Sequence, residues 1–494
     1  MKFNSTRNRE IEVTSAFAIK NGLASDGGLY VPEEFPKVSL NDLEMLLDKD
    51  YIQRAKFILS KYLTDFTADE IEYCVTKAYT SKFDSENPAP VVKLTDNQYV
   101  CELWHGPTCA FKDIALQILP YLMKTSIKKT GEDKTVVILV ATSGDTGKAA
   151  LEGFKDVEGT KIIVFFPNNG VSDIQKLQMV TQEGNNVYVF GIKGNFDNAQ
   201  TGVKEIFTDK EFCDKFNEKG YMFSSANSIN FGRLVPQVVY YFSSYLDVVK
   251  SGDIKLGDKI NFAVPTGNFG NILAAYYAMN MGLPVNKLIC ASNRNNILTD
   301  FINTGIYDKN REFYQTASPS MDILISSNLE RLLYELADKD DKLIAELMNE
   351  LKNKGRYVIN KEMHNRIKDL FYGGFIDDDK TMTVIGNTYK EHQYVPDTHT
   401  AVAIGVYEDY IKNTGDNTKT IIMSTASPFK FSKDVLKGLG KTADFDDYRL
   451  LEILAEEFSL NIPKPLLNLN KKEIRFNEVY DKNNMKDAVT NSLN

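Results

Sequence analysis

A lysine in an unusual setting is the first residue that could carry chemistry. Lys112 follows a Gly106-Pro107 turn and a short apolar run, and it precedes residues 114–119, whose apolar pattern predicts a helix that Asp113 could cap. A lysine held there beside Phe111 is partly removed from water, which lowers its pKa. A neutral amine can form a Schiff base with an aldehyde, so Lys112 is a candidate nucleophile. The alternative is an ordinary surface lysine at the start of a helix.

Two glycine-rich loops are the next candidates. Ser143-Gly144-Asp145-Thr146-Gly147 follows the apolar run 135–141, and Gly267-Asn268-Phe269-Gly270-Asn271 follows the run 259–265. Glycines let backbone amides approach an anion, and the N-terminus of a following helix adds a favourable dipole. Neither loop has the spacing of a P-loop or of G-x-G-x-x-G, and each alone could be a tight structural turn. Two such loops and a reactive lysine fit pyridoxal phosphate (PLP) with an amino-acid substrate: one loop for the cofactor phosphate, one for the substrate, and the lysine for the aldehyde.

Strand and helix patterns alternate from residue 134 onward, which is typical of an open α/β sheet with ligands beyond the carboxyl ends of its strands. The predicted strands are 135–141, 161–166, 187–192, 259–265, 288–291 and 420–423. The predicted helices are 148–154, 173–182, 197–208, 234–249, 272–281 and 402–407. Residues 329–354 predict a helix that is charged on one face, and Gly373-Gly374 predicts a break in regular structure.

The chain is predicted to divide into two parts. Residues 1–90 form a separate, mainly helical domain, and the stretch 85–90 is the best linker candidate. Residues 91–494 form the catalytic region, in which a smaller α/β subdomain at about 130–225 is inserted into the larger one.

The composition excludes several classes of protein. A net charge of −9 argues against a dedicated nucleic-acid surface, and no apolar run is long enough for a transmembrane helix. Five cysteines without a C-x-x-C pair and an N-terminus without an apolar segment predict a cytoplasmic protein with reduced thiols. None of the four histidines has metal-ligand spacing with another, so no metal site is expected. His105 and His399 are expected to have structural roles.

Several motifs together resemble one enzyme family. They are ASDGGLYVP at 24–32, ELWHGPTCAFKD at 102–113, ATSGDTG at 141–147, SANSINFGR at 225–233, PTGNFGN at 265–271, DTHTA at 397–401 and STASPFKF at 424–431. The chain resembles the threonine synthases, PLP enzymes related to the tryptophan synthase β-subunit, in their longer microbial form with an extra N-terminal domain. The resemblance implies open, mostly parallel sheets flanked by helices and the conversion of O-phospho-L-homoserine and water to L-threonine and phosphate.

The resemblance also assigns site residues. Lys112 matches the cofactor-binding lysine, and Thr425 matches the hydroxyl residue that faces the pyridine nitrogen. Gly267, Asn268, Phe269, Gly270 and Asn271 match the loop around the cofactor phosphate. Position 271 is often an aspartate in relatives, so its backbone amide is the group expected to matter. Ser143, Gly144, Asp145 and Thr146 match the substrate loop, although related enzymes usually have asparagine where Asp145 stands. Candidates for the substrate phosphate are Ser228, Asn230, Arg233 and Lys430.

Other functions stay open on the same scaffold. A phospho-lyase that makes 2-oxobutyrate, or a dehydratase, differs only in whether water is added at the substrate's Cβ, which residue types do not decide. A catalytically silent homologue is the third alternative, although such a protein would be expected to lack the lysine. The extra N-terminal domain resembles that of monomeric relatives, so a monomer without nucleic-acid or membrane partners is expected.

Overall fold

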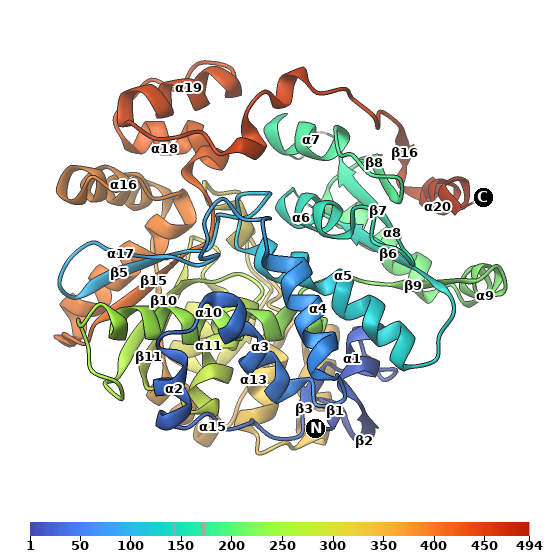
Figure 1. Cartoon of the computed structure of the whole chain (residues 1–494), viewed down its shortest axis with the longest axis horizontal. Coiled ribbons are helices and arrows are strands. Elements are labelled where there is room, and N and C mark those ends of the chain that lie inside the picture. Colours follow the sequence, from blue (N-terminus) through green and yellow to red (C-terminus); the bar gives the residue numbers. More distant parts are fainter. Residues whose placement is uncertain (143, 169–170, 172, 494) are drawn as a thin grey trace.

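The fold has two large sheets: a six-stranded sheet that is parallel except for one edge strand, on the left in Figure 1, and a five-stranded parallel sheet, on the right. The computed structural model describes all 494 residues except 143, 169, 170, 172 and 494. Across the larger sheet the strands are β14 (Phe371–Phe375), β11 (Val285–Ser292), β10 (Ile260–Pro265), β15 (Thr420–Ser424), β5 (Gln98–Glu102) and β4 (Val91–Lys93). All neighbours are parallel except β4 and β5.

Helices cover both faces of the larger sheet. The chain contributes α10 (Phe231–Lys250), α11 (Gly270–Met281), α12 (Ile297–Thr304), α16 (Asp378–His392), α17 (Thr398–Thr414), α18 (Ser432–Gly438) and α19 (Asp447–Phe458). Along β10, Phe262 and Val264 belong to the apolar core that includes α10 and α11, whereas Ala263 belongs to the core that includes α17. Successive strand residues point to opposite faces, so α11 and α17 lie on opposite sides of the sheet.

The smaller sheet is entirely parallel. Its strands are, in order, β16 (Val479–Asp481), β8 (Val187–Lys193), β7 (Thr160–Pro167), β6 (Thr135–Ala141) and β9 (Tyr221–Ser224). The helices around it are α5 (Lys112–Lys129), α6 (Asp145–Phe154), α7 (Asp173–Val180), α8 (Phe196–Thr208), α9 (Lys210–Glu218) and α20 (Met485–Leu493). Val136 and Ile138 pack with α5 and α6, while Val137 and Leu139 pack with α8 and α20. This alternation buries β6 on both faces, as its continuous apolar run predicts.

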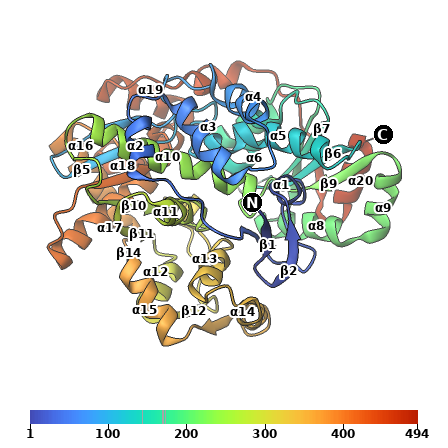
Figure 2. The ribbon, with the colours of Figure 1, turned by 60° about the horizontal axis from the view of Figure 1, so that its bottom comes forward.

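The N-terminal region combines a small antiparallel sheet with helices. The sheet has the order β2 (Asn8–Val13), β1 (Phe3–Ser5) and β3 (Tyr30–Pro32), and the helices are α1 (Ser15–Asn21), α2 (Leu40–Leu46), α3 (Tyr51–Tyr62) and α4 (Ala68–Tyr79). Helices α3 and α4 contact α10 and α5. Arg7 forms a two-point ion pair with Glu330, at 2.8 and 2.7 Å, which ties this region to α13 (Leu329–Leu336). Figure 2 shows α12, α13, α14 (Asp341–Lys354) and α15 (Lys361–Leu370) grouped around β12 (Ile306–Asp308). Strand β12 pairs with β13 (Arg356–Val358).

The structure corrects two predictions from the sequence. The helix predicted over 329–354 is two helices, α13 and α14, because Asp338 and Lys339 between them have left-handed φ values of 52° and 66°. Gly373-Gly374 is no break but the centre of edge strand β14, where Gly374 faces Val406 and Tyr372 too closely for a side chain. The smaller sheet also takes up β16 from far along the chain. The division at residue 90 and the bounds of the smaller subdomain stay predictions.

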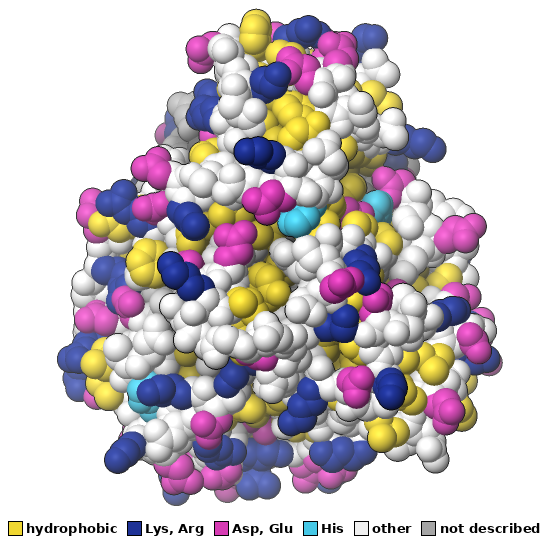
Figure 3. Space-filling model, turned by 90° about the vertical axis from the view of Figure 1, so that its left-hand side faces the viewer, with side chains coloured by type: hydrophobic (Ala, Val, Ile, Leu, Met, Phe, Trp, Pro, Cys, Tyr) yellow, Lys and Arg dark blue, Asp and Glu magenta, His cyan; other side chains and the backbone are white. Residues whose placement is uncertain are grey.

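The surface is mixed in charge on the face that Figure 3 shows, where basic and acidic side chains alternate over short distances. In the described ranges, every helix is too short or too polar to cross a membrane. The five cysteines are unpaired.

Glu335 makes the stability of this fold depend on pH. Its side chain is buried in α13, its Oε1 has no partner among the described residues, and burial raises its pKa from 4.5 to about 7, although Lys339 and Arg366 oppose the shift. A carboxyl whose pKa is raised on folding stabilises the fold fully below its unfolded pKa and less as the pH rises through its folded pKa. We therefore expect the free energy of unfolding to fall by roughly 3 kcal/mol from pH 4.5 to above pH 7 through this group.

Glu335→Gln should remove that pH dependence and make the protein more stable than the wild type above pH 7. Denaturant unfolding at pH 5 and pH 8 measures the effect, and Glu346→Gln, an exposed position on α14, serves as the control. An equal difference between wild type and variant at both pH values would contradict the assignment.

Candidate active site

Lys112 lies where two distant segments of the chain run side by side. The stretch after β5 pairs with the end of β15: Leu103 N–H donates to Ser424 O at 2.9 Å, and Phe111 N–H donates to Thr425 O at 2.8 Å. Ser427 N–H completes the pairing by donating to the carbonyl of residue 109 at 3.1 Å. Because β5 and β15 are parallel neighbours, both segments leave the sheet at the same edge. The predicted lysine and the predicted hydroxyl residue Thr425 are therefore brought together.

The turn before Lys112 is held by Asp113. Its carboxylate accepts the N–H and the hydroxyl of Thr108, at 2.8 and 2.7 Å, and a Cβ on Gly106 would lie 2.5 Å from the Asp113 side chain. Burial raises the pKa of Asp113 to about 6. Cys109 in this turn has a left-handed φ of 59°. The predicted cap was wrong: α5 begins at Lys112, and Asp113 bonds back to the turn instead of capping the helix.

The Lys112 amine is nearly enclosed. Its side chain is 12% exposed, and its Nζ lies 3.6 Å from Asp145 Oδ2 and 3.4 Å from the hydroxyl of Ser320. Burial lowers the pKa of Lys112 below 10.5, Asp145 opposes this, and the positive charges of Lys430 and Arg233 lower it further. The amine therefore loses its proton at a lower pH than a surface lysine does.

Asp145 is shared between two lysines. Lys430 Nζ lies 2.6 Å from Asp145 Oδ1 and also donates to Thr108 O at 3.0 Å, and Gln175 donates to the same carboxylate oxygen at 3.1 Å. Burial alone would raise the pKa of Asp145, but Lys430 and Lys112 hold it well below its usual range. The carboxylate stays ionised, and the buried Lys430, predicted as a phosphate ligand, already has two protein partners.

The predicted substrate loop is shaped by the residue that precedes it. Thr142 Oγ1 accepts the N–H groups of Gly144 and Gly147 at 3.0 and 2.9 Å, which turns the chain from β6 into α6. Gly144 has a φ of 142°, and a Cβ there would lie 2.5 Å from the Gln175 side chain. Thr146 is half-buried, and Ser143, predicted as part of this loop, lies outside the described residues.

The second glycine-rich loop forms a cradle of backbone amides at the start of α11. Phe269 has a left-handed φ of 62°, and no N–H from 267 to 271 donates to any acceptor in the described part of the chain. The carbonyls are held instead: Ser326 donates to Gly267 O at 2.8 Å, and the Asn328 amide donates to Asn268 O at 3.0 Å. Free amides at a helix N-terminus are an anion site. The backbone of Gly267, Asn268, Phe269 and Gly270 thus offers N–H groups that have no acceptor among the described residues.

Asn271 and Thr425 differ in how their side chains are used. The Asn271 Oδ1 accepts the hydroxyls of Tyr240 and Tyr241 at 2.5 and 2.7 Å, so this side chain packs against α10, while its Nδ2 has no hydrogen-bond partner among the described residues. The Thr425 side chain is 6% exposed, and its hydroxyl forms no hydrogen bond with the residues described.

The motif at 225–233 supplies one buried cationic side chain, Arg233. Asn230 caps α10, accepting from Gly232 N–H at 2.8 Å and donating to Ile19 O at 2.8 Å, so its side chain is committed. Ser228 accepts from Asn328 at 3.4 Å. Arg233 is buried with Nη1 bonded to Ala226 O, while its Nε has no partner among the described residues, and burial lowers the pKa of Arg233 to about 10.

Sequence reasoning missed Ser320 and Gln175, which contact the predicted residues. Both come from segments with no recognised motif, and no local pattern marks them.

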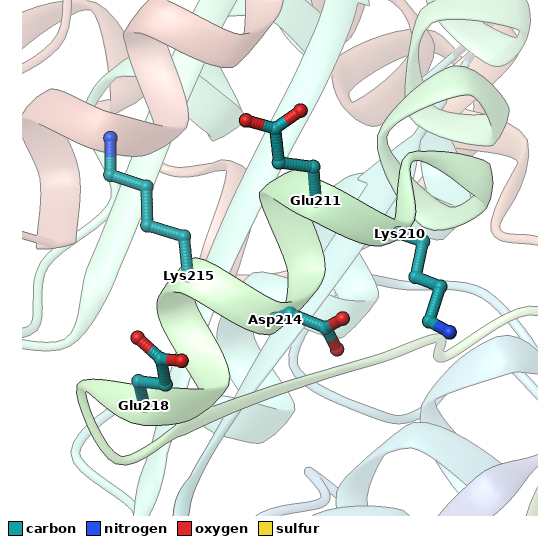
Figure 4. Close-up of a pocket in the computed structure, with 5 residues that line it drawn as sticks. All are labelled: Lys210, Glu211, Asp214, Lys215 and Glu218. Atoms are coloured by element: carbon teal, nitrogen blue, oxygen red, sulfur yellow. The ribbon is translucent and has the colours of Figure 1, made fainter.

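A surface depression lies away from these residues, along α9. It has a volume of about 570 Å³ and is lined by Lys210, Glu211, Asp214, Lys215 and Glu218 (Figure 4). These are exposed side chains of one helix that point in different directions, and none is a predicted site residue.

Family models match consecutive parts of the chain. Residues 2–79 match "Threonine synthase N terminus", residues 83–361 match "Pyridoxal-phosphate dependent enzyme" and residues 400–489 match "Threonine synthase, C-terminal". The second of these covers more than half of the chain and includes Lys112 and both glycine-rich loops. Fold and site thus define a member of the PLP-dependent enzymes.

Individual relatives narrow this class. Threonine synthase-like 1 of Homo sapiens is 43% identical over 432 residues, which cover 85% of this chain but only 57% of that protein. The threonine synthase of Pseudomonas aeruginosa is 37% identical over 442 residues, 89% of this chain and 91% of that protein. The crystal structure of PLP-bound threonine synthase from Brucella melitensis has a TM-score of 0.89 at 35% identity and covers 100% of this chain and 99% of that one. The chain belongs to the threonine synthase family.

Substitution of Asp145 and substitution of its partner Lys430 should shift the pKa of Lys112 in opposite directions. Asp145→Asn removes the negative charge that raises the pKa of Lys112, so that pKa should fall, whereas Lys430→Met removes a positive charge that lowers it, so that pKa should rise. Acylation of Lys112 across a pH range, followed by mass spectrometry of the cofactor-free protein, measures both shifts. Lys352→Met on the exposed face of α14 is the control, and two shifts in the same direction would refute the arrangement.

Proposed function

We propose that this chain is a threonine synthase that converts O-phospho-L-homoserine and water to L-threonine and phosphate, with PLP held on Lys112. The single observation that carries the proposal is the enclosed Lys112 amine, set beside the Asp145 loop and joined through Ser320 to the amide cradle of residues 267–271. An amine with a lowered pKa and two anion-binding loops are what an amino-acid enzyme with a phosphorylated aldehyde cofactor needs.

The residues fit PLP on structural grounds of their own. The cradle has unpaired N–H groups, and a side chain on Gly267 would lie 2.7 Å from Ser320 O, so the loop admits no Cβ there. Lys112 would hold the aldehyde end, residues 267–271 the phosphate, and the unbonded hydroxyl of Thr425 the pyridine nitrogen. Bound in this way, PLP supplies an electron sink for a carbanion at the substrate's Cα.

Each side chain then has a defined task. The Lys112 amine takes the proton from Cα and serves as the acid and base for the neighbouring carbons, which requires the lowered pKa. Residues 144–146 receive the amino acid. The carboxylate of Asp145 is held by its ion pair with Lys430, so it is directed away from the like-charged carboxylate of the substrate. A neutral Thr425 at the pyridine nitrogen, in place of a carboxylate, leaves the ring less protonated and limits side reactions.

Arg233 is the proposed ligand of the substrate phosphate. A buried guanidinium with an unpaired N–H is costly, and an anion would satisfy it. Among the four candidates from the sequence, Asn230 and Lys430 have protein partners, and Ser228 carries no charge. The phospho-lyase and the silent homologue remain outcomes of the tests below, since a 43% identical relative bears the name threonine synthase-like 1. A monomeric state and a cytoplasmic location stay predictions.

Lys112→Ala should abolish both cofactor attachment and turnover. The wild type incubated with PLP should gain a visible absorption band, and borohydride reduction should fix PLP on the peptide that contains Lys112, as read by mass spectrometry. The variant should show neither effect and should lose at least about 10³-fold in activity, because both the attachment point and the base are removed. Lys128→Ala in the last turn of α5 is the control.

Product analysis distinguishes the three functions. Threonine and phosphate in equal amounts support the proposal, and 2-oxobutyrate with phosphate would replace it by a phospho-lyase. A protein that attaches no PLP would be a silent homologue.

Arg233→Gln should weaken substrate binding more than turnover. Removal of this buried guanidinium, whose Nε N–H has no partner among the described residues, should raise KM for O-phosphohomoserine by roughly 10–100-fold, the loss expected for a charge-assisted hydrogen bond. Arg233→Lys should recover part of this because it restores the charge without the paired geometry. An unchanged KM in steady-state assays would remove Arg233 from the phosphate site.

A further inference from the structure

Ser320 is the point at which the parts of the site meet. It lies in the short 3-10 turn Pro319–Met321, and its hydroxyl is 3.4 Å from Lys112 Nζ and 3.4 Å from Asp145 Oδ2. Its carbonyl oxygen lies against the amide cradle: a Cβ added at Gly267 would be only 2.7 Å from it. One residue therefore touches the reactive lysine, the substrate loop and the phosphate loop.

A buried histidine holds Ser320 from behind. The Ser320 N–H donates to His399 Nε2 at 3.1 Å, and His399 Nδ1 lies 2.8 Å from Asp397 Oδ1. His399 is 2% exposed, and Asp397 is fully buried. Because Nε2 accepts a hydrogen bond, the imidazole carries its proton on Nδ1 and gives it to the carboxylate. Phe431 packs edge-on against this ring, with the ring centres 4.7 Å apart.

The arrangement differs from a nucleophilic serine triad. His399 Nε2 is occupied by the backbone N–H of Ser320 and not by its hydroxyl, so the ring is not placed to take the hydroxyl proton. The hydroxyl points the other way, toward Lys112 and Asp145. It can accept from the Lys112 ammonium while it donates to the Asp145 carboxylate.

The turn is fixed from a second side. The Asn293 amide donates to Thr316 Oγ1 at 2.8 Å, to Ser318 Oγ at 2.9 Å and to Asp322 Oδ1 at 2.8 Å. Asp322 also accepts the Thr316 N–H at 3.0 Å. A loop tied at both ends presents Ser320 in one position, which is what a group that orients another side chain requires.

We propose that Ser320 is a positioning residue for the Lys112 amine, and that Asp397 and His399 fix it through its backbone N–H. The inference rests on the proposed function, in which that amine must reach the carbons of the substrate. A lysine end group has much rotamer freedom, and the hydroxyl removes part of it by holding Nζ beside the Asp145 carboxylate.

The test follows the Lys112 amine itself. In full-length protein freed of cofactor, Ser320→Ala removes an acceptor of the ammonium, so the midpoint of Lys112 acylation should move to lower pH by roughly 0.5–1 unit. With PLP and substrate, kcat should fall about tenfold with little change in KM, as expected when only the orientation of the base is lost. Ser320→Thr keeps the hydroxyl and should resemble the wild type.

The role of His399 is tested by comparing the effect of its substitution with the effect of Ser320→Ala. His399→Phe keeps a ring against Phe431 but accepts no hydrogen bond, and it should reproduce the Ser320→Ala profile. The double variant should show no further change, because both substitutions act on one hydroxyl. His364→Ala, at a histidine on α15 that contacts the carbonyl of residue 302, is the control. If His399→Phe does not fold, His399→Leu, which also accepts no hydrogen bond, takes its place in the double variant.

Two results would overturn the inference. One is an unchanged acylation midpoint in Ser320→Ala, and the other is a double variant whose shift is the sum of the two single shifts. Acylation needs neither cofactor nor substrate, so it decides the role of Ser320 even if the wild type forms no threonine. If the wild type forms threonine and Ser320→Ala acylates normally, the positioning inference fails while the proposed function stands.

Discussion

One buried carboxylate sets the charge balance of the whole site. Asp145 lies between two lysines, closer to Lys430 than to Lys112, at 2.6 and 3.6 Å. An isolated charge at this depth would be expensive, and the short pair with Lys430 offsets most of that penalty. Lys112 is left with a long, weak contact and the repulsion of a nearby cation, so it can give up its proton. The site thus holds Lys430 in a short ion pair and leaves Lys112 with a lowered pKa.

The order of strands in the larger sheet explains why these groups meet. β10, β15 and β5 are adjacent and parallel, and from their carboxyl ends come the amide cradle, Thr425 and the segment leading to Lys112. The smaller sheet adds Asp145 at the end of β6, the strand between β7 and β9. Residues from four regions of the sequence converge because parallel strands all release their following loops on one side.

The sequence was sufficient where local rules decide. The run 135–141 matched β6, since a continuous β-branched stretch has few other uses, and the two glycine loops were found because a strand, a turn and a helix follow in order. It failed where contacts between distant segments decide. Gly374 lies in a strand because it packs against β11 and Val406, and Ser320 belongs to the site because His399 and Asn293 hold its turn there. The roles of Arg233 and Lys430 looked equal in sequence, and they differ in the structure because Lys430 pairs with Asp145 while Nε of Arg233 has no partner among the described residues.

The late position of β16 and α20 in the chain has a consequence for synthesis. During translation, β6 to β9 emerge long before the segment that pairs with β8 and covers Val137 and Leu139. Until that segment is made, β8 is an open edge, and one face of the smaller sheet lacks part of its cover. The nascent subdomain is therefore exposed to aggregation until β16 and α20 have been made and cover it.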